Sequence, residues 1–361
     1  MAIGCGGALA GCTAAVRTTT EPRPAGTDSV WYMSVRARDQ GTDTRLLADS
    51  VEYGVAIYHR DASDGTTPDV VLTLVDSITL SASAFRDALR GEVTARPTTD
   101  AVAMLYVHGF GTSLHEAWKF TAQARQLAGS RAPWIAFCWP SNGRGITWPR
   151  AGALLTRAYQ EDSMAAQASR PTFVRVVGAL AESLDDNTLV MAVHSLGAQL
   201  AGESLAFDSP LRAVLERRPL RALAFMVPDV EAERFRDTLL PAFAPITRRQ
   251  VLYVSSRDRA LAIAGQTAGA PRAGQRTNPV LRHPLLETVD ITDGVTTEGW
   301  FQRAFGTHHA IRRQAGMLFD LTHIVGAGLA ASCRADVGTG WLREDGTWAL
   351  RKGTLPPRDS L

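Results

Sequence analysis

Short apolar runs alternate with stretches of helical spacing through most of the chain. The runs are rich in β-branched and aromatic residues, and the segments between them repeat apolar residues every three or four positions. The expected strands are 101–107, 133–139, 189–193, 220–227, 251–255 and 287–291. The expected helices are 113–128, 161–184, 199–207, 231–239, 259–265 and 309–329. This alternation predicts an α/β fold with a mostly parallel central sheet and helices on both faces.

The chain before residue 100 has a different pattern. Residues 29–37, 51–59 and 70–80 are strand-like, and clusters of Asp, Gly, Thr and Pro separate them. We expect them to form antiparallel strands at one edge of the sheet.

Both ends of the chain also depart from the alternation. Residues 1–29 are rich in small residues and then in Thr and Pro, which is typical of a leader followed by a disordered linker. Residues 30–331 are then expected to form the folded domain. Residues 332–361 are expected to form a tail with a hairpin around Asp345 and Gly346.

Within the leader, the sequence from Leu9 to Cys12 matches a bacterial lipobox, which is cleaved before a cysteine that then carries lipid. Lipid on Cys12 would anchor the domain to a membrane, in the periplasm or elsewhere in the cell envelope. Against this, the first basic residue is Arg17, and the apolar segment before Cys12 is short for a signal. The alternative is a chance match in a cytoplasmic protein.

Composition and charge exclude several classes of function. The 361 residues are 45% hydrophobic and 20% charged, which is ordinary for a globular protein. The formal net charge is +2 without a basic block, so no nucleic-acid partner is expected. No apolar run approaches the roughly 20 residues that span a bilayer. The other cysteines, Cys5, Cys138 and Cys333, have no metal-binding spacing, and neither a metal nor a cofactor is expected.

The clearest candidate for chemistry is Ser195, where an apolar strand passes into a helix without a turn-forming cluster. This is typical of a nucleophile elbow, a strained turn that exposes a serine hydroxyl and places its backbone at a helix N-terminus. The usual Gly-x-Ser-x-Gly signature reads VHSLG from Val193 to Gly197, with a β-branched residue in first position. A serine that caps an ordinary helix is the alternative.

A Gly-rich segment follows the expected strand 101–107. In His108-Gly109-Phe110-Gly111 the glycines let the backbone curl so that N–H groups point into a cleft, as an oxyanion hole requires. The backbone N–H groups of Phe110 and Leu196 would then hold the oxyanion of a tetrahedral intermediate. Nucleotide binding is disfavoured, because neither Gly-Lys-Ser/Thr nor a complete Gly-x-Gly-x-x-Gly is present.

Later strand ends supply acids and bases. Asp229 and Asp258 follow two successive strands, and His308 and His309 lie at the head of the last expected helix. Ligands in open α/β sheets bind at the carboxyl ends of the strands, and the chain order Ser, Asp, His is that of α/β-hydrolases. Each acid has an alternative role. Asp258 lies between two arginines that would hold it in a surface ion pair, and Asp229 would suit a helix N-cap.

These segments together resemble a known family. The carriers of the resemblance are VHGFGTSLHEA, the segment 138–143, the pattern of Tyr159, Asp162 and Ser169, AVHSLG, VPDVEAERF and LYVSSRDRAL. They are similar to the bacterial α/β-hydrolases of unknown function of the DUF900 type, over most of residues 30–329. The resemblance implies the α/β-hydrolase fold, with Ser195 as nucleophile, Asp258 as acid and His308 as base. Members often start with a lipoprotein-like leader.

The sequence departs from the family pattern in three places. The family usually has Ala where this chain has Val193, Met where it has Leu196, and a His-Ser-Tyr stretch where it has His308-His309-Ala310. Val193 affects how the elbow packs. The change at His308-His309-Ala310 leaves His309 as an alternate base. Asp229 is the alternate acid.

Supporting roles are expected for residues around the cleft. His108 would hold the Gly-rich loop by hydrogen bonds, and Trp139 would shape the wall of the cleft. Tyr159 and Asp162 would tie the following helix to that wall, and the side chain of His194 should point away from the cleft. The loops 142–158 and 265–284 are candidates for a small cap.

The sequence therefore predicts a serine hydrolase that acts on a small substrate with an ester or related acyl bond. The alternative is a catalytically silent envelope protein that keeps the hydrolase fold for binding. Loss of one triad residue would favour that alternative, and all three residue types are present.

Overall fold

The computed structural model describes residues 27–39, 42–60, 71–97, 101–141, 153–293, 308 and 314–352. Cys12 and the rest of the expected leader up to residue 26 lie outside these residues, as do His309 and residues 142–152.

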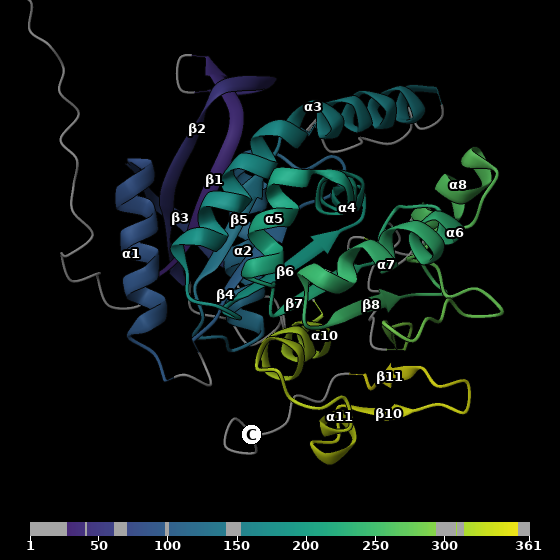
Figure 1. Ribbon diagram of the computed structural model, residues 1–361. Coiled ribbons are helices and arrows are strands. Elements are labelled where there is room, and N and C mark those ends of the chain that lie inside the picture. Colours follow the sequence, from purple (N-terminus) through teal and green to yellow (C-terminus); the bar gives the residue numbers. More distant parts are fainter. Residues whose placement is uncertain are drawn as a thin grey trace, which may run out of the picture.

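One sheet of 11 strands runs through the described part of the chain (Figure 1), in the order β10-β11-β9-β8-β7-β6-β4-β5-β1-β2-β3. The strands are β1 (Thr27–Asp39), β2 (Thr42–Arg60), β3 (Leu72–Leu80), β4 (Ala103–Val107), β5 (Trp134–Cys138), β6 (Leu189–His194), β7 (Ala222–Met226), β8 (Gln250–Val254), β9 (Glu287–Asp290), β10 (Gly340–Leu342) and β11 (Trp348–Leu350). All neighbours from β5 to β9 pair in parallel. The predicted mostly parallel α/β fold is confirmed.

The two edges of the sheet are antiparallel. At one edge β1 pairs in parallel with β5, and β2 and β3 follow in antiparallel order, as the sequence predicts. At the other edge β10 and β11 form a hairpin through Asp345 and Gly346, and β11 pairs in parallel with β9. The hairpin expected in the tail is thus a continuation of the central sheet (Figure 1).

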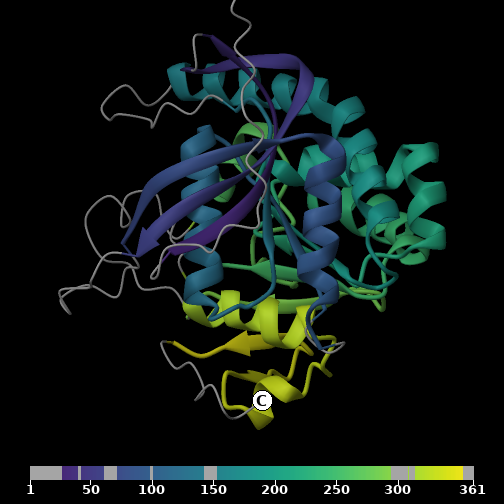
Figure 2. The ribbon, with the colours of Figure 1, turned by 90° about the vertical axis from the view of Figure 1, so that its left-hand side faces the viewer.

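The helices lie on both sides of this sheet (Figure 2). They are α1 (Ala82–Thr94), α2 (Leu114–Leu127), α3 (Ala153–Ser183), α4 (Gly197–Phe207), α5 (Ser209–Arg217), α6 (Ala232–Arg234), α7 (Leu240–Phe243), α8 (Arg259–Ala268), α10 (Ala315–Phe319) and α11 (Cys333–Asp336), with π-helical turns η1 (Phe235–Leu239) and η4 (Asp320–Gly326) and a 3₁₀ turn η2 (Ala244–Ile246). Within the described residues, no helix is long and apolar enough to cross a membrane.

The central strands are buried on both faces, and alternate residues pack into two separate cores. On β4, Leu105 and Val107 pack with α1, α3 and α4, whereas Met104 and Tyr106 pack with α2 and α10. Burial of each large apolar side chain stabilises the fold by about 1.5–3 kcal/mol. Because both faces are covered, the strands appear in the sequence as continuous apolar runs.

The sequence pattern predicts neither α1 nor α5. Helix α1 buries one residue per turn, Phe85, Leu89 and Val93, and Gly91 interrupts its pattern. Helix α5 follows α4 directly, because Asp208 ends one helix and its side chain caps the next through the N–H of Leu211. Both are short amphipathic helices that tertiary packing stabilises more than local propensity does.

A buried ion network fastens α11 and η4 to the sheet. The fully buried Arg334 of α11 donates to Asp320 of η4 at 2.6 and 2.8 Å and also pairs with Glu287 of β9. Arg249 donates to Glu287 at 2.7 Å, and Tyr253 donates to Asp320 at 2.8 Å. Each buried charge is therefore compensated, which is the condition under which such charges are tolerated.

Replacing Arg334 with Met should lower the free energy of unfolding by about 3–5 kcal/mol, because Asp320 would keep a buried negative charge without its cation. Urea unfolding measures the loss. Arg236→Met is the matched control, because Arg236 and Asp237 form an exposed pair, and it should leave the midpoint unchanged. Equal midpoints for the two variants would contradict a stabilising role of the network.

Candidate active site

Ser195 lies at the turn from β6 to α4 in the left-handed region of backbone conformation. Its φ is 51°, which is strained for a residue with a Cβ. Its N–H donates to Met226 O and its C=O accepts from Asp229 N–H, both at 3.1 Å. The N-cap position of α4 is Leu196, without a side-chain cap. Ser195 therefore has the geometry of a nucleophile elbow and does not cap the helix.

The elbow packs directly on the Gly-rich loop that follows β4. A Cβ on Gly197 would lie 2.4 Å from His108 O, and a Cβ on Gly109 would lie 2.9 Å from Ser195 Cβ. Contacts this short exclude a side chain at either position. The two glycines allow the loop and the elbow to touch through their backbones.

Val193, which departs from the family pattern, fits into the core. It pairs with Val107 of β4 on one side and Phe225 of β7 on the other, and it is fully buried. Its side chain packs in the core that contains α3 and α4. The elbow thus accommodates a β-branched residue at this position.

His308 lies between Ser195 and Asp258. Its Nε2 is 2.8 Å from Ser195 Oγ, and its Nδ1 is 2.6 Å from Asp258 Oδ2. The three residues are 6% exposed or less. Asp258 Oδ1 accepts the N–H of Leu261 at 3.0 Å, so the same carboxylate caps α8 and contacts the imidazole. This second bond fixes the carboxylate toward His308.

The structure supports neither of the alternative roles, a surface ion pair for Asp258 and a helix N-cap for Asp229. Asp258 is 3% exposed, so it is not a surface residue, and its carboxylate pairs with His308. Its neighbour Arg257 lies 3.9 Å from Asp293 instead. Asp229 does not cap α6, whose N-cap is Glu231.

Asp229 forms its own buried contacts, with Tyr159 and Arg272, next to the elbow. Its Oδ2 accepts the Tyr159 O–H at 2.6 Å, and its Oδ1 lies 3.1 Å from Arg272 Nε. Burial raises the pKa of the Asp229 carboxyl above its ordinary value, while the Tyr159 hydrogen bond and the Arg272 charge oppose that shift. Within the described residues, Asp258 is the carboxylate that contacts the His308 ring.

The two backbone N–H groups expected to form an oxyanion hole are available. Neither Phe110 N–H nor Leu196 N–H donates to another atom of the described chain. The adjacent Gly111, at φ 65°, donates its N–H to Asp162 Oδ2 at 2.9 Å. This bond engages the Gly111 N–H, which is therefore not available to a substrate oxygen.

The supporting residues hold the loop from several sides. Trp139 Nε1 donates to His108 O at 2.8 Å, and the two rings stack with centroids 4.9 Å apart. His108 Nδ1 is 3.0 Å from Gly109 O. These contacts hold the loop against the end of β5.

His194 was expected to point away from the cleft, and this prediction is wrong. Its ring packs on that of His308 with centroids 5.1 Å apart. A Cβ on Gly109 would lie 2.9 Å from His194 Nδ1. His194 is the last residue of β6, and its side chain lies against the imidazole of His308.

Arg36 is a functional-site support that the sequence analysis missed. Although buried in β1, it donates to the carbonyl oxygens of Thr112, Trp139 and Ser141 at 3.1, 2.7 and 2.8 Å. The sequence does contain a sign of this role. Arg36 lies within an apolar strand-like run, and an arginine that is buried there requires hydrogen-bond partners.

The first expected cap loop, 142–158, is described only from residue 153, where helix α3 has already begun, so the prediction of a loop is wrong for residues 153–158. Residues 142–152 lie outside the described chain. The loop 265–284 is pinned to the ends of β7 and β8, where Gly274 N–H donates to Pro228 O at 3.0 Å and Gly274 O accepts from Ser255 N–H at 3.1 Å. This loop is part of the wall beside Asp229.

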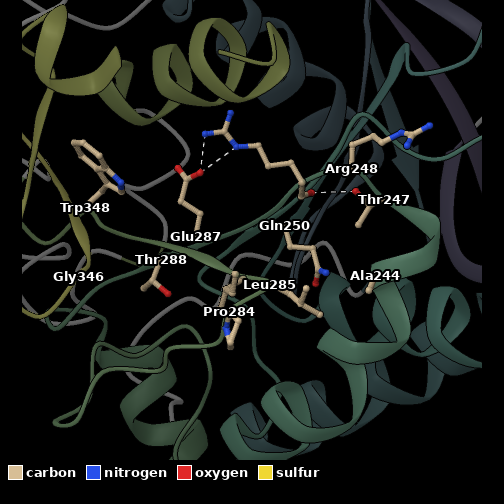
Figure 3. A pocket seen from close by; sticks show the side chains of 12 residues that line it. Ala244, Thr247, Arg248, Gln250, Pro284, Leu285, Glu287, Thr288, Gly346 and Trp348 are labelled. Carbon is tan, nitrogen blue, oxygen red and sulfur yellow. Dashed lines mark hydrogen bonds and ion pairs between the residues drawn. The ribbon is translucent and has the colours of Figure 1, made fainter. Parts of the chain in front are cut away.

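A cleft of about 510 Å³ lies elsewhere, at the amino ends of β8 and β9 (Figure 3). Gln250, Thr288 and Trp348 line it, and the ion pair of Arg249 and Glu287 forms one wall. None of Ser195, His308 and Asp258 lines it, so it is not the site of the proposed chemistry. Across the described residues, no group of His, Cys, Asp and Glu side chains could hold a metal ion.

Solved structures similar to this chain include three hydrolases. An arylesterase has 12% sequence identity and a TM-score of 0.32, with 86% of this chain and 89% of that chain covered. A prolyl endopeptidase has 14% identity, TM-score 0.28 and coverages of 83% and 39%. Oligopeptidase B from Leishmania major has 13% identity, TM-score 0.31 and coverages of 86% and 38%. The chain thus spans about two fifths of each peptidase, and similarity at this level says nothing about substrate. No curated protein matches the sequence.

Gly197→Ala should destabilise the protein by about 1–3 kcal/mol, because the new methyl group would push His108 and the elbow apart. Thermal unfolding measures the change. Gly91→Ala in α1 is the matched control, since no atom lies within 4 Å of the added Cβ, and it should be neutral or stabilising. If Gly197→Ala is as stable as the wild type, the loop and the elbow are not packed as closely as described.

The sequence itself identifies the family. A family model described as an alpha/beta hydrolase of unknown function, DUF900, matches residues 81–283, more than half of the chain. The chain belongs to this family of α/β-hydrolases and has the α/β-hydrolase fold.

Proposed function

We propose that the protein is a serine hydrolase that cleaves an ester or related acyl bond through an acyl-enzyme. The observation that carries the proposal is the unbroken chain of contacts from Ser195 Oγ to His308 and from His308 to Asp258, at 2.8 and 2.6 Å. These distances are in the range that proton transfer between a nucleophile and its base requires. Membership in a hydrolase family supports the same class of reaction.

In the acylation step, Ser195 Oγ attacks the substrate carbonyl while His308 Nε2 takes the hydroxyl proton. Asp258 accepts from Nδ1–H, which keeps Nε2 free as the base and stabilises the imidazolium that forms. The carbonyl oxygen becomes negative and is held by the N–H groups of Phe110 and Leu196. His308 then gives its proton to the leaving alcohol, and the acyl group remains on Ser195.

In the deacylation step, water replaces the alcohol. His308 takes one water proton as the oxygen attacks the acyl carbonyl, and the same N–H groups hold the second oxyanion. The proton returns to Ser195 Oγ as the acid product leaves. The low exposure of the three side chains strengthens each of these electrostatic contacts.

A fluorophosphonate probe tests the nucleophile. The wild-type protein should be labelled in one-to-one amount, because the probe requires an activated serine, and Ser195→Ala should not be labelled. Intact-mass analysis gives the stoichiometry. Equal labelling of the two proteins would contradict the assignment of Ser195, and an unlabelled wild type would favour a silent binding protein.

Two conservative substitutions separate the roles of the acids. Asp258→Asn should lower kcat on the order of 10⁴-fold, because the imidazole would lose its orienting partner. Asp229→Asn should keep most of the kcat, since its amide oxygen can still accept from Tyr159. It should instead lower stability by about 3 kcal/mol, because Arg272 would lose its counter-ion. The reverse pattern, measured with an activated aryl ester and urea unfolding, would assign the acid to Asp229.

A further inference from the structure

The two N–H groups of the proposed oxyanion hole come from separate parts of the chain. Phe110 follows β4, whereas Leu196 follows β6. Donors stabilise an oxyanion only when they are already fixed at the right spacing, so a device that holds both segments is required. The first described turns of α3 contact both of them.

Asp162 of α3 holds the Phe110 side. The Asp162 carboxylate, 1% exposed, accepts the N–H of Gly111 at 2.9 Å and the hydroxyl of Ser141 at 2.6 Å. Ser141 Oγ in turn accepts the N–H of Thr112 at 3.0 Å. One buried carboxylate thus fixes two consecutive backbone N–H groups immediately after Phe110, directly and through a hydroxyl.

Tyr159, one helical turn before Asp162, holds the elbow side. Burial, reinforced by the neighbouring carboxylate, raises the pKa of Tyr159 well above its ordinary value, so its hydroxyl stays protonated. That hydroxyl donates to Asp229 Oδ2 at 2.6 Å, and the backbone N–H of Asp229 donates to Ser195 O at 3.1 Å. The Tyr159 ring also packs on Phe110, with ring centroids 6.0 Å apart.

Further contacts make this connection rigid. Gln199 of α4 donates both to Tyr159 Oη at 3.1 Å and to Asp229 O at 2.9 Å. Val227, two residues before Asp229, has a φ of 43°, a strained conformation for a β-branched residue. Such strain persists only where surrounding contacts over-determine the backbone, and here it places Asp229 between the elbow and α3.

We infer that Tyr159 and Asp162 are positioning residues that set the spacing of the oxyanion hole. Because they lie three positions apart on α3, they share one face of the helix, and a single rigid element spans both segments. This inference rests on the proposed function. Its consequence is specific to the transition state: loss of either contact should lower kcat with little change in KM, because substrate in the ground state does not need the fixed donors.

The test compares Tyr159→Phe, Asp162→Asn and Asp162→Ala with the wild type on p-nitrophenyl acetate. Tyr159→Phe should lower kcat about tenfold, the effect of one buried hydrogen bond. Asp162→Ala should lower it about 10²–10³-fold, as loss of an oxyanion donor does, with Asp162→Asn between the two. The rate of inactivation by a fluorophosphonate should fall in the same order.

Ser169→Ala is the matched control on the same helix. Ser169 is fully buried and donates to Ala165 O at 2.7 Å, and within the described residues it forms no hydrogen bond to the loop or the elbow. It should lose stability but keep kcat. If Tyr159→Phe and both Asp162 variants also keep kcat, or raise only KM, the inference is overturned.

Hydrogen exchange of the Gly111 amide gives a readout that needs no activity. Exchange should be faster in Asp162→Ala than in Ser169→Ala, because the Gly111 N–H loses its acceptor. Equal exchange would overturn the role of Asp162. By contrast, a wild type that neither hydrolyses p-nitrophenyl acetate nor is labelled at Ser195 would contradict the proposed function itself.

Discussion

The backbone contact between the loop after β4 and the elbow after β6 is the constraint on which the site depends. Val107 pairs with Val193, so the residues that follow leave the two strands side by side. Gly109 then faces Ser195, and Gly197 faces His108, at distances that leave no room for a Cβ. The register of the sheet and the two glycines thus bring Ser195 and the N–H groups of the loop close together.

Three buried carboxylates surround this contact, and their partners give each a different role. Asp258 contacts the imidazole and caps α8, Asp162 holds the loop, and Asp229 connects the elbow to Tyr159 and Arg272. A buried carboxylate without partners is costly, so Asp258 and Asp162 each accept two hydrogen bonds, and Asp229 has the Tyr159 hydroxyl and the Arg272 charge. The site can therefore hold three acids close together while one of them touches His308.

Local patterns in the sequence predicted the parallel sheet and the turn at Ser195, whereas the choice of Asp258 over Asp229 and of His308 over His309 came from the resemblance to the family. Continuous apolar runs mark strands buried on both faces, and Ser195 and Asp258 follow the parallel strands β6 and β8, whose carboxyl ends lie at the same edge of the sheet. The contact of His194 with His308 joins residues 114 positions apart, which no local periodicity encodes. The bonds of Arg36 and Tyr159 join segments far apart in the chain, and no local pattern specifies such pairs.

The structure of the protein after reaction with a phosphonate ester tests the central claim most directly, because the adduct is tetrahedral and carries an oxygen in place of the oxyanion. Phosphorus should be bonded to Ser195 Oγ, and the phosphonyl oxygen should lie about 2.7–3.1 Å from the backbone nitrogens of Phe110 and Leu196. An adduct on another residue, or a phosphonyl oxygen turned away from both nitrogens, would contradict it.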